Sequence, residues 1–499
     1  MSRLPYKYIV SITFVVGIFI NLLDTTIVNV ALPTLQEEFD ATTTEIQWVV
    51  TAYLVALGVF IPVSGWAGDR FGTKKVYIVS LGLFTFASLL CGLAWNVESL
   101  ILFRVLQGAA GGMITPIGQA MLFRAFPPAE RAAAAAILTI PIVVAPASGP
   151  VLGGYLVEYQ DWPWIFFINV PIGLFGLAIA ILGLREERQE SAGTLDLPGF
   201  LLSSIGLGTL LYGLAEAGSR GFDDPRVVAF LVTGLLLLTI FCFVELRVQQ
   251  PMVDIRLFKN KLFAAANTVQ FLSMAGLQGA LFLLPLLLQT AKGLSPLEAG
   301  LTTFPQAIGV ALMSQPAGRI YPRLGPRRMM MAGMLVIALT TLAFLLVDLE
   351  TSRGWIMLIQ FVRGCGFALT LIPLQAATFA TISPADTGRA TAIFNTGRQV
   401  AASFGVALLA TILTNRLTAN DAVLGDPTTL DGTVNAFHEA FFASAILSVI
   451  GLVACFLIDD KEAEATMVRV REGPEAVPTA PGVPTPGTAE LPRASPGGD

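Results

Sequence analysis

Gly65-Trp-Ala-Gly-Asp-Arg-Phe-Gly-Thr-Lys-Lys75 is a short charged stretch, punctuated by glycines, between two apolar segments. A weaker copy occurs later in the chain as Gly318-Arg-Ile-Tyr-Pro-Arg-Leu-Gly-Pro-Arg-Arg328. Counted from the first glycine of each copy, an arginine, a second glycine and a basic pair fall at the same spacing. We interpret both copies as loops. A loop that repeats between apolar segments predicts a duplicated helical bundle, the architecture from which many secondary transporters are built.

The composition indicates a membrane protein. Of the 499 residues, 54% are hydrophobic and 13% are charged, and the mean hydropathy is +0.72. A helix needs about 20 apolar residues to cross a bilayer, and runs of that length recur along most of the chain. We predict about fourteen spans by this length criterion. They cover residues 9–33, 46–67, 76–95, 99–123, 132–157, 162–184, 195–216, 227–246, 262–291, 297–318, 328–347, 355–382, 389–415 and 436–458.

The basic residues predict how the chain is oriented. Most of the 30 Lys and Arg residues fall in segments that lie on the same side as the N-terminus. Basic segments between spans stay in the cytoplasm. Because the number of predicted spans is even, both termini share that side. We therefore expect a multi-pass protein of the cell (inner) membrane, surrounded by lipid bilayer, with both termini cytoplasmic.

The repeat divides the predicted spans into two halves. Residues 1–190 hold the first six spans and residues 251–460 hold the last six, while residues 191–250 hold two spans that belong to neither half. Residues 461–499 contain many Pro, Gly, Ala and Thr. Such a composition cannot form a packed core, so we expect a disordered cytoplasmic tail. The predicted fold is all-α, with two six-helix bundles plus two extra central helices.

Several classes of chemistry are disfavoured by what the sequence lacks. The net charge of −5 argues against a nucleic-acid partner. No glycine-rich phosphate loop followed by Lys and Ser or Thr occurs, which argues against ATP hydrolysis. The four cysteines lack the paired spacing of zinc or redox sites, and the single His438 cannot form a catalytic triad alone. We therefore expect no catalysed reaction, no metal, no cofactor and a monomeric protein.

Charged residues fall inside several predicted spans, among them Asp24, Arg104, Arg363 and Arg398, and a charge there is costly and usually functional. Asp24 lies past the middle of the first span, and Arg104 lies near the outer end of the fourth. Both are in the outer half of the bilayer, so they can pair. We hypothesise that Asp24 takes up and releases a coupling proton, because a nearby cation favours the carboxylate and desolvation favours the acid. The alternative is a static buried ion pair that locks two helices.

Polar residues at helical spacing predict a cavity. Asn21 lies one turn before Asp24 and shares its face. The fourth span adds Thr115 and Gln119, and the ninth adds three residues at similar spacing. A few polar groups on apolar walls are typical of ligand sites, whereas hydrogen bonds between packed helices are the simpler interpretation of each residue. The predicted substrate cavity comprises Asn21, Thr115, Gln119, Gln270, Met274 and Gln278.

Glycines and one proline mark segments that we predict to move. In the charged stretch, glycine allows tight turns, and Asp69 either caps the next helix or pairs with a basic residue across the bundle. In the fifth span, a proline bends the helix and glycines four residues apart let a second helix approach. The predicted gating residues are Gly65, Asp69, Arg70, Gly72, Gly149, Pro150, Gly153 and Gly154.

These motifs together resemble the major facilitator superfamily. The charged stretch resembles its signature loop between the second and third spans, and Leu102-Phe-Arg104-x-x-Gln107-Gly108 resembles the motif of its fourth span. Residues 145–154 are similar to the motif associated with antiporters, with Ala145 in place of its first glycine. Leu23-Asp24-x-Thr-Ile-Val-Asn29-Val-Ala-Leu-Pro33 resembles the first-span signature of the fourteen-span drug:proton antiporter family. The resemblance covers about residues 8–460.

The resemblance implies alternating access and proton-coupled efflux of lipophilic drugs or toxic compounds. Relatives that export multivalent cations tend to carry acidic residues in later spans, whereas no carboxylate lies well inside spans nine to fourteen here. Neutral, monocationic or lipid-like substrates therefore fit better. Two alternatives stay open: an exporter dedicated to an endogenous lipid, antibiotic or siderophore, and a membrane sensor or scaffold that transports nothing.

Overall fold

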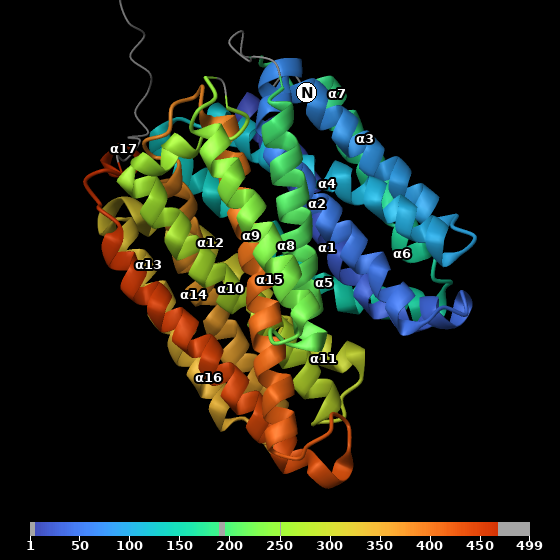
Figure 1. Ribbon diagram of the computed structural model, residues 1–499. Coiled ribbons are helices and arrows are strands. Elements are labelled where there is room, and N and C mark those ends of the chain that lie inside the picture. Colours follow the sequence, from blue (N-terminus) through green and yellow to red (C-terminus); the bar gives the residue numbers. More distant parts are fainter. Residues whose placement is uncertain (1–4, 189–194, 250, 468–499) are drawn as a thin grey trace, which may run out of the picture. The chain divides into compact units, whose positions relative to one another are not determined.

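A computed structural model describes residues 5–188, 195–249 and 251–467, and every regular element in these residues is helical (Figure 1). The α-helices are α1 Tyr6–Glu38, α2 Thr43–Phe71, α3 Thr73–Gly92, α4 Val97–Ala125, α5 Arg131–Tyr159, α6 Trp164–Phe167, α7 Asn169–Gly183, α8 Leu197–Arg220, α9 Pro225–Glu245, α10 Lys261–Thr290, α11 Pro296–Thr303, α12 Pro305–Leu324, α13 Pro326–Ala343, α14 Arg353–Thr378, α15 Thr387–Ala419, α16 Leu430–Ala454 and α17 Glu464–Met467. Short 3₁₀ helices cover Pro128–Glu130, Ile255–Lys259, Phe344–Leu346, Pro427–Thr429 and Cys455–Leu457.

Within these described residues, twelve helices are long and apolar enough to cross a membrane. The predicted fourteen spans are therefore not confirmed by this count. Two of the fourteen predicted spans are not among these twelve helices. One of them corresponds to α5, in which the structure does not describe several side chains, and the other covers α11 and α12. The helix is interrupted at Phe304, and α12 restarts with Pro305 as its first residue. A proline is favoured there because the first helical N–H has no partner within the helix.

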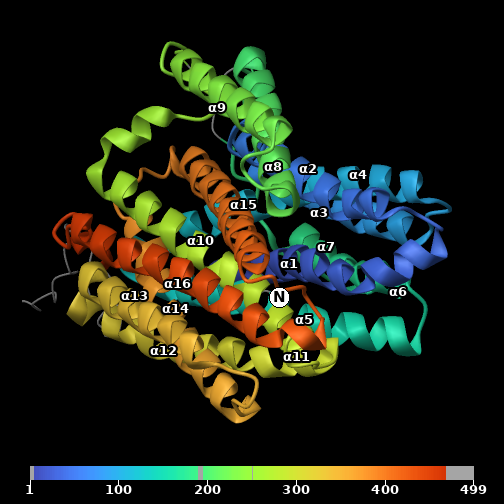
Figure 2. The same cartoon turned by 60° about the horizontal axis from the view of Figure 1, so that its bottom comes forward.

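The helices form two bundles that pack in equivalent ways. In the first bundle α2 packs on α4, α1 on α5 and α3 on α7; in the second, α12 packs on α14, α10 on α15 and α13 on α16. One apolar core lies within the first bundle and another within the second, whereas two further cores contain residues of both bundles. The bundles meet through α2 against α15 and α5 against α12, which is again an equivalent pair of contacts (Figure 2). The sequence repeat thus corresponds to a repeat in the packing.

The prediction that residues 65–75 form a loop is wrong. Helix α2 continues to Phe71 and α3 begins at Thr73, so the turn is made by Gly72 alone. Gly72 has φ +96°, a conformation that residues with a Cβ adopt only with strain. A Cβ at this position would also lie 2.2 Å from a carboxylate oxygen of Glu186.

An acidic side chain from a distant segment closes each of the two repeated turns. The Glu186 carboxylate accepts hydrogen bonds from the backbone N–H groups of Lys74 (3.1 Å) and Lys75 (3.2 Å) at the start of α3. The equivalent turn after α12 is made by Gly325, with φ +76°. There the Asp460 carboxylate accepts from the N–H of Arg327 at 2.9 Å. Both carboxylates satisfy free N–H groups and the positive end of a helix dipole.

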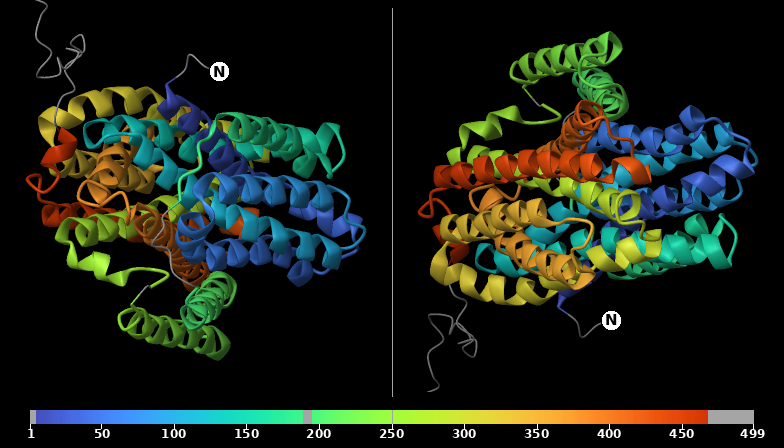
Figure 3. Two further views of the ribbon diagram at one scale, coloured as in Figure 1. Left: turned by 90° about the horizontal axis from the view of Figure 1, so that it is seen from above. Right: turned by 90° about the horizontal axis from the view of Figure 1, so that it is seen from below.

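The two extra helices are central in the sequence but peripheral in space. Helix α8 packs against α2 of the first bundle and α15 of the second, and α9 covers the outer face of α8 (Figure 3). The contacts include a stacked pair of rings, Trp48 and Tyr212, with centroids 5.3 Å apart. Only 17% of the most apolar stretch of α9 is buried inside the protein. Its apolar surface suits a lipid environment, which solvates such side chains.

The beginning of the predicted disordered tail is ordered. Residues 461–467 include the short helix α17, in which Thr466 is buried and forms a 2.6 Å hydrogen bond with the Tyr321 hydroxyl of α12. The prediction that disorder begins at residue 461 is wrong for these residues, because a hydroxyl pair fixes them to α12. Residues 468–499, which make up the rest of the predicted tail, lie outside the described residues.

Candidate proton site and interbundle contacts

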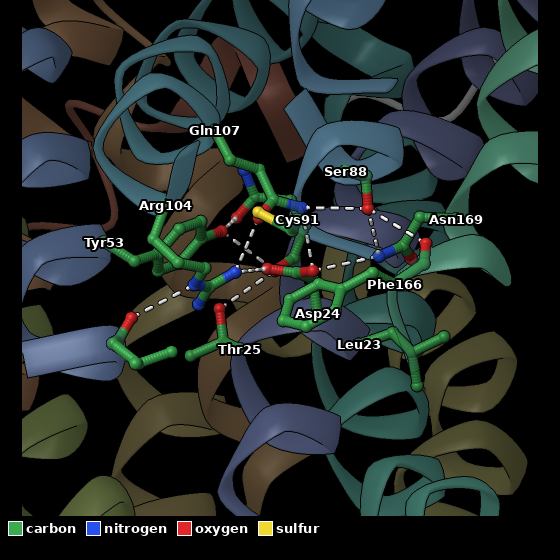
Figure 4. Close-up of polar contacts among 12 residues, drawn as sticks. Leu23, Asp24, Thr25, Tyr53, Ser88, Cys91, Arg104, Gln107, Phe166 and Asn169 are labelled. Atoms are coloured by element: carbon green, nitrogen blue, oxygen red, sulfur yellow. Dashed lines mark hydrogen bonds and ion pairs between the residues drawn. The ribbon is translucent and has the colours of Figure 1, made fainter. Parts of the chain in front are cut away.

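Asp24 and Arg104 form an ion pair inside the first bundle (Figure 4). Arg104 Nη1 lies 2.6 Å from Asp24 Oδ2, and both side chains are completely buried. The pairing expected from the sequence is therefore present in the structure. Because water does not reach either group, the charge on Asp24 is balanced by the side chains around it.

Two amides complete the environment of the carboxylate. Gln107 Nε2 and Asn169 Nδ2 each donate to Asp24 Oδ1 at 2.9 Å. Both amides also donate to the Ser88 hydroxyl at 3.1 Å, and this hydroxyl donates to the carbonyl of Phe166. The charged form of Asp24 thus accepts three hydrogen bonds from Arg104, Gln107 and Asn169, so three helices (α1, α4 and α7) meet at one carboxylate, and Ser88 joins α3 to the two amides.

Sequence reasoning missed most of these partners. Asn169 and Ser88 were not identified as site residues, and Gln107 was noted only as part of the fourth-span motif. A polar residue at the start of the otherwise apolar helix α7 is the signal that points to Asn169. Ser88 gives no such signal, because serine is common in helices that pack tightly within membranes.

Glycines in α4 bring Arg104 close to α2. A Cβ at Gly108 would lie 2.4 Å from the Tyr53 carbonyl, and one at Gly112 would lie 2.3 Å from that of Leu57. Their absence allows the two backbones to approach closely. At this separation the Arg104 guanidinium lies 4.0 Å from the centre of the Tyr53 ring. The spacing of the fourth-span motif therefore positions the cation as well as the helix.

The predicted cavity residues lie in three helices of the two bundles, α1, α4 and α10. Asn21 is buried between α1, α2 and α4, where its backbone and side-chain oxygens both lie 3.4 Å from the Tyr53 hydroxyl. Thr115 is buried in α4. In α10, Met274 is buried and Gln278 is half-buried. Asn21 thus packs against Tyr53, and Met274 lies in an apolar core that also includes Ala132, Ala135 and Ala136 of α5.

Two of the predicted glutamines do lie near the junction of the bundles. Gln119 Oε1 accepts a 2.6 Å hydrogen bond from Asn395 Nδ2, which joins α4 to α15. Gln270 Nε2 donates to the carbonyl of Phe394, also in α15, at 3.0 Å. Helix α15 therefore connects polar side chains of both bundles in this structure.

The predicted gating residues of the charged stretch lie at the end of the bundles where α1 begins. Asp69 pairs with Arg124 at 2.9 Å, and Arg124 Nε donates to the carbonyl of Pro384 in the second bundle at 3.2 Å. Asp69 therefore pairs with a basic residue of its own bundle and does not cap α3. A Cβ at Gly65 would lie 2.8 Å from the carbonyl oxygen of Gly388. Together Gly65, Asp69, Arg124, Pro384 and Gly388 form what we call the interbundle contact.

Neighbouring residues extend this contact. Arg131 donates to the carbonyl of Phe379, and the Phe123 and Phe379 rings stack with centroids 4.6 Å apart. Arg70 is exposed beside the contact, and Gly72 makes the turn described above. Residues from α2, α4, α5 and the segment before α15 therefore hold the two bundles together at this end.

The glycines of the fifth span have different surroundings. A Cβ at Gly149 would lie 2.1 Å from the Thr26 hydroxyl, so α5 approaches α1 closely there. Gly153 is buried, whereas a Cβ at Gly154 would meet no atom within 4 Å. Helix α5 runs without interruption from Arg131 to Tyr159. The side chain of Pro150 lies outside the description.

The paired bundles, the apolar helices and the buried ion pair define a polytopic membrane protein of the transporter class. Comparison with known proteins is more specific, because residues 14–406 and 266–484 match the Major Facilitator Superfamily. The chain belongs to this family, and it is a transporter with a multi-pass membrane topology.

The most similar proteins include transporters named for drug resistance. The chain is 35% identical to the multidrug resistance protein B homolog of Mycobacterium tuberculosis, over 80% of this chain and 75% of that protein. It is 34% identical to the puromycin resistance protein pur8 of Streptomyces alboniger, over 88% and 89% of the two chains. The proton:xylose symporter XylE shares the fold, with a TM-score of 0.64 over 93% of this chain and 98% of that chain at 13% identity.

Proposed function

We propose that this protein exports lipophilic compounds across the cell membrane in exchange for protons, and that Asp24 carries the proton. The observation that carries the proposal is the complete burial of Asp24 among Arg104 and two amides. A buried ionisable residue within a membrane is by default a functional site. The names of the multidrug and puromycin resistance relatives support export of drugs or toxic compounds.

Protonation changes what the Asp24 carboxyl group can bind. The charged carboxylate accepts from Arg104 Nη1 and from the two amides. A proton on the carboxyl group removes its charge and converts one oxygen into a donor, so the attraction to Arg104 is lost. Arg104 then keeps only its contacts with Gln107 (2.7 Å), the Val49 carbonyl (3.1 Å) and the Tyr53 ring. Loading and release of the proton thus change how α1 is held against α4.

We propose that residues 1–190 and 251–460 move as two bodies that expose the transport path alternately to each side. On this proposal the end that carries the interbundle contact faces the cytoplasm, because basic segments gather there. The structure then corresponds to a state in which the cytoplasmic end is closed. Opening requires that the contacts between Gly65 and Gly388 and between Arg124 and Pro384 separate.

Gly65→Ala should open the cytoplasmic end. The added methyl group would lie 2.8 Å from the Gly388 carbonyl oxygen, closer than real Cβ atoms come, so the closed state must strain or separate. A shift of about 1.4 kcal/mol multiplies the open fraction by about tenfold. We would measure the rate at which a maleimide labels Thr391→Cys, a buried position in α15, in a protein without its four native cysteines.

The control for this experiment is Gly354→Ala, because a methyl group at Gly354 meets no atom within 4 Å. We expect this variant to label at the parental rate and Gly65→Ala to label several times faster. Equal labelling of Gly65→Ala and the parent would show that α2 and α15 do not form the closed gate.

The charge distribution favours substrates without several positive charges. Helices α10, α12, α13, α14 and α15 contain no Asp or Glu, while α14 and α15 contribute the buried or half-buried Arg363 and Arg398. A multivalent cation would find no counter-charge in these helices. We therefore propose neutral, monocationic or amphipathic lipophilic compounds as substrates.

Reconstituted vesicles with an acidic lumen test the proposed function. A lipophilic substrate added outside should discharge the pH gradient, because each substrate that enters is exchanged for a proton. Each elementary charge that moves through about 100 mV supplies about 2.3 kcal/mol. Discharge by compounds from a broad panel would support drug efflux, and discharge by one endogenous lipid, antibiotic or siderophore would support a dedicated exporter. Failure of every compound would favour a sensor or scaffold.

A further inference from the structure

The second bundle contains a buried arginine at a position that mirrors the proton site. Helix α4 reads Arg104-Val-Leu-Gln107-Gly108, and α14 reads Gln360-Phe-Val-Arg363-Gly364, with the arginine and glutamine exchanged. The glycines have equivalent roles: a Cβ at Gly108 would lie 2.4 Å from a carbonyl of α2, and one at Gly364 would lie 2.1 Å from a carbonyl of α12. The two segments therefore occupy equivalent places in the two bundles.

Arg363 has no hydrogen-bond partner in the described part of the chain. Its side chain is 1% exposed, and Nε, Nη1 and Nη2 are all buried and unpaired. Two aromatic rings face the guanidinium, Phe367 at 5.6 Å and Phe344 at 5.8 Å from the ring centroids. Aromatic faces attract a cation but accept few of its five N–H groups. The charge and the donors of Arg363 are thus left without a counterpart.

Helices α10, α12, α13, α14 and α15 of the second bundle contain no Asp or Glu that could supply that counterpart. Arg104 is balanced by Asp24 of α1, whereas α10, the equivalent of α1, contains no Asp or Glu. A guanidinium stays protonated in proteins, so Arg363 cannot become neutral to avoid the free energy of burying a charge. A charge buried without a partner is strongly destabilising. Because no described acidic residue pairs with Arg363, a group outside the described residues is needed to balance it.

A further donor accompanies the guanidinium. Gln360 Nε2 donates to Gln306 Oε1 at 3.2 Å, and the Gln306 amide nitrogen is left buried and unpaired. Exchanging the assigned positions of N and O in both amides would still leave one NH₂ group without an acceptor. The backbone carbonyl of Gln306 also lies against Gly364, the residue after Arg363. The groups left unpaired in this region are therefore the donors of Arg363 and Gln306 and one acceptor, the Gln360 amide oxygen.

We propose that Arg363 binds a small monovalent anion of the size of chloride inside the second bundle, with the Gln306–Gln360 pair as its second contact. An anion would balance the guanidinium as Asp24 balances Arg104, and it would accept from donors that otherwise have no partner. The anion must be small, because the side chains that would bind it are almost completely buried: Gln306, Gln360 and Arg363 are each no more than 2% exposed. This inference is independent of the substrate and of the role of Asp24.

Thermal unfolding in two salts tests the proposal. The purified protein in detergent would be unfolded in sodium chloride and in sodium gluconate at equal ionic strength. A ligand that binds only the folded state raises the melting temperature with its concentration. We expect a rise of about 2–4 °C in chloride over gluconate for the wild type, a similar rise in bromide, and no difference between the salts for Arg363→Met.

Two further measurements keep the test decisive. Arg416→Gln removes the same charge from an exposed pair with Glu439 and should keep the full chloride effect. In gluconate Arg363→Met should melt at or above the wild-type temperature, because it removes an unbalanced charge. If the wild type melts equally in chloride and gluconate, or if Arg363→Met keeps the chloride effect, the proposed anion site is wrong.

Discussion

Asp24→Asn should abolish discharge of the pH gradient by transported compounds, while exchange of the same compound down its own gradient continues. The amide is nearly the same size as the carboxyl group and retains one oxygen that accepts hydrogen bonds, which limits the loss of stability caused by leaving Arg104 without its counter-charge. It cannot take up or release a proton at physiological pH. The measurement is the rate of lumenal alkalinisation in reconstituted vesicles, with counterflow of labelled substrate in the absence of a pH gradient as the second readout.

The matched control is Glu439→Gln, which neutralises an acid that lies exposed at 2.8 Å from Arg416. We expect it to discharge the gradient at the wild-type rate. Discharge by Asp24→Asn at the wild-type rate would show that another group carries the proton. Loss of counterflow together with discharge would instead assign Asp24 to substrate binding or to folding.

Arg104→Gln should cause a large loss of stability. The variant leaves the Asp24 carboxylate completely buried with two neutral amides and no cation. Removing one partner of a buried ion pair costs about 3–5 kcal/mol. We expect a large fall in the melting temperature at neutral pH. The fall should be smaller at acidic pH, because a protonated Asp24 carries no charge that needs a partner.

The double variant Asp24→Asn with Arg104→Gln separates charge balance from packing. It removes both charges, so no uncompensated group remains, and we expect it to recover most of the melting temperature that Arg104→Gln loses. It should still fail to discharge a pH gradient. A double variant that melts as low as Arg104→Gln alone would mean that the arginine stabilises the bundle through the Tyr53 ring and the Val49 carbonyl rather than through Asp24.

The pairing of Asp24 with Arg104 could be predicted because both charges stand out against apolar helices and lie at similar depths. Ser88 and Asn169 could not be found in the same way. They come from α3 and α7, and only the packing of the helices brings Asn169 to the carboxylate and Ser88 to the two amides that bind it. A neutral polar residue in a membrane helix has many uses, so its type alone does not indicate its partner.

The predicted cavity residues also show what helical spacing in the sequence cannot determine. Helical spacing predicts that Asn21 shares the face of Asp24 and groups Gln270 with Met274, but it cannot show which face meets the other bundle. In the structure Asn21 packs against Tyr53 within the first bundle, whereas Gln119 reaches Asn395 of the second. Which polar residues lie at the junction depends on the rotation of each helix, which is set by its packing.

The sequence by itself determined the helical membrane fold, the internal duplication and the positions of the buried charges. Apolar length, glycine spacing and isolated charges are local properties, so each can be read from neighbouring residues. The tertiary structure alone decided that Glu186 caps α3, that Asp460 caps α13 and that two amides hold Asp24. These contacts join residues more than 80 positions apart, and their energies arise only after the helices have packed together.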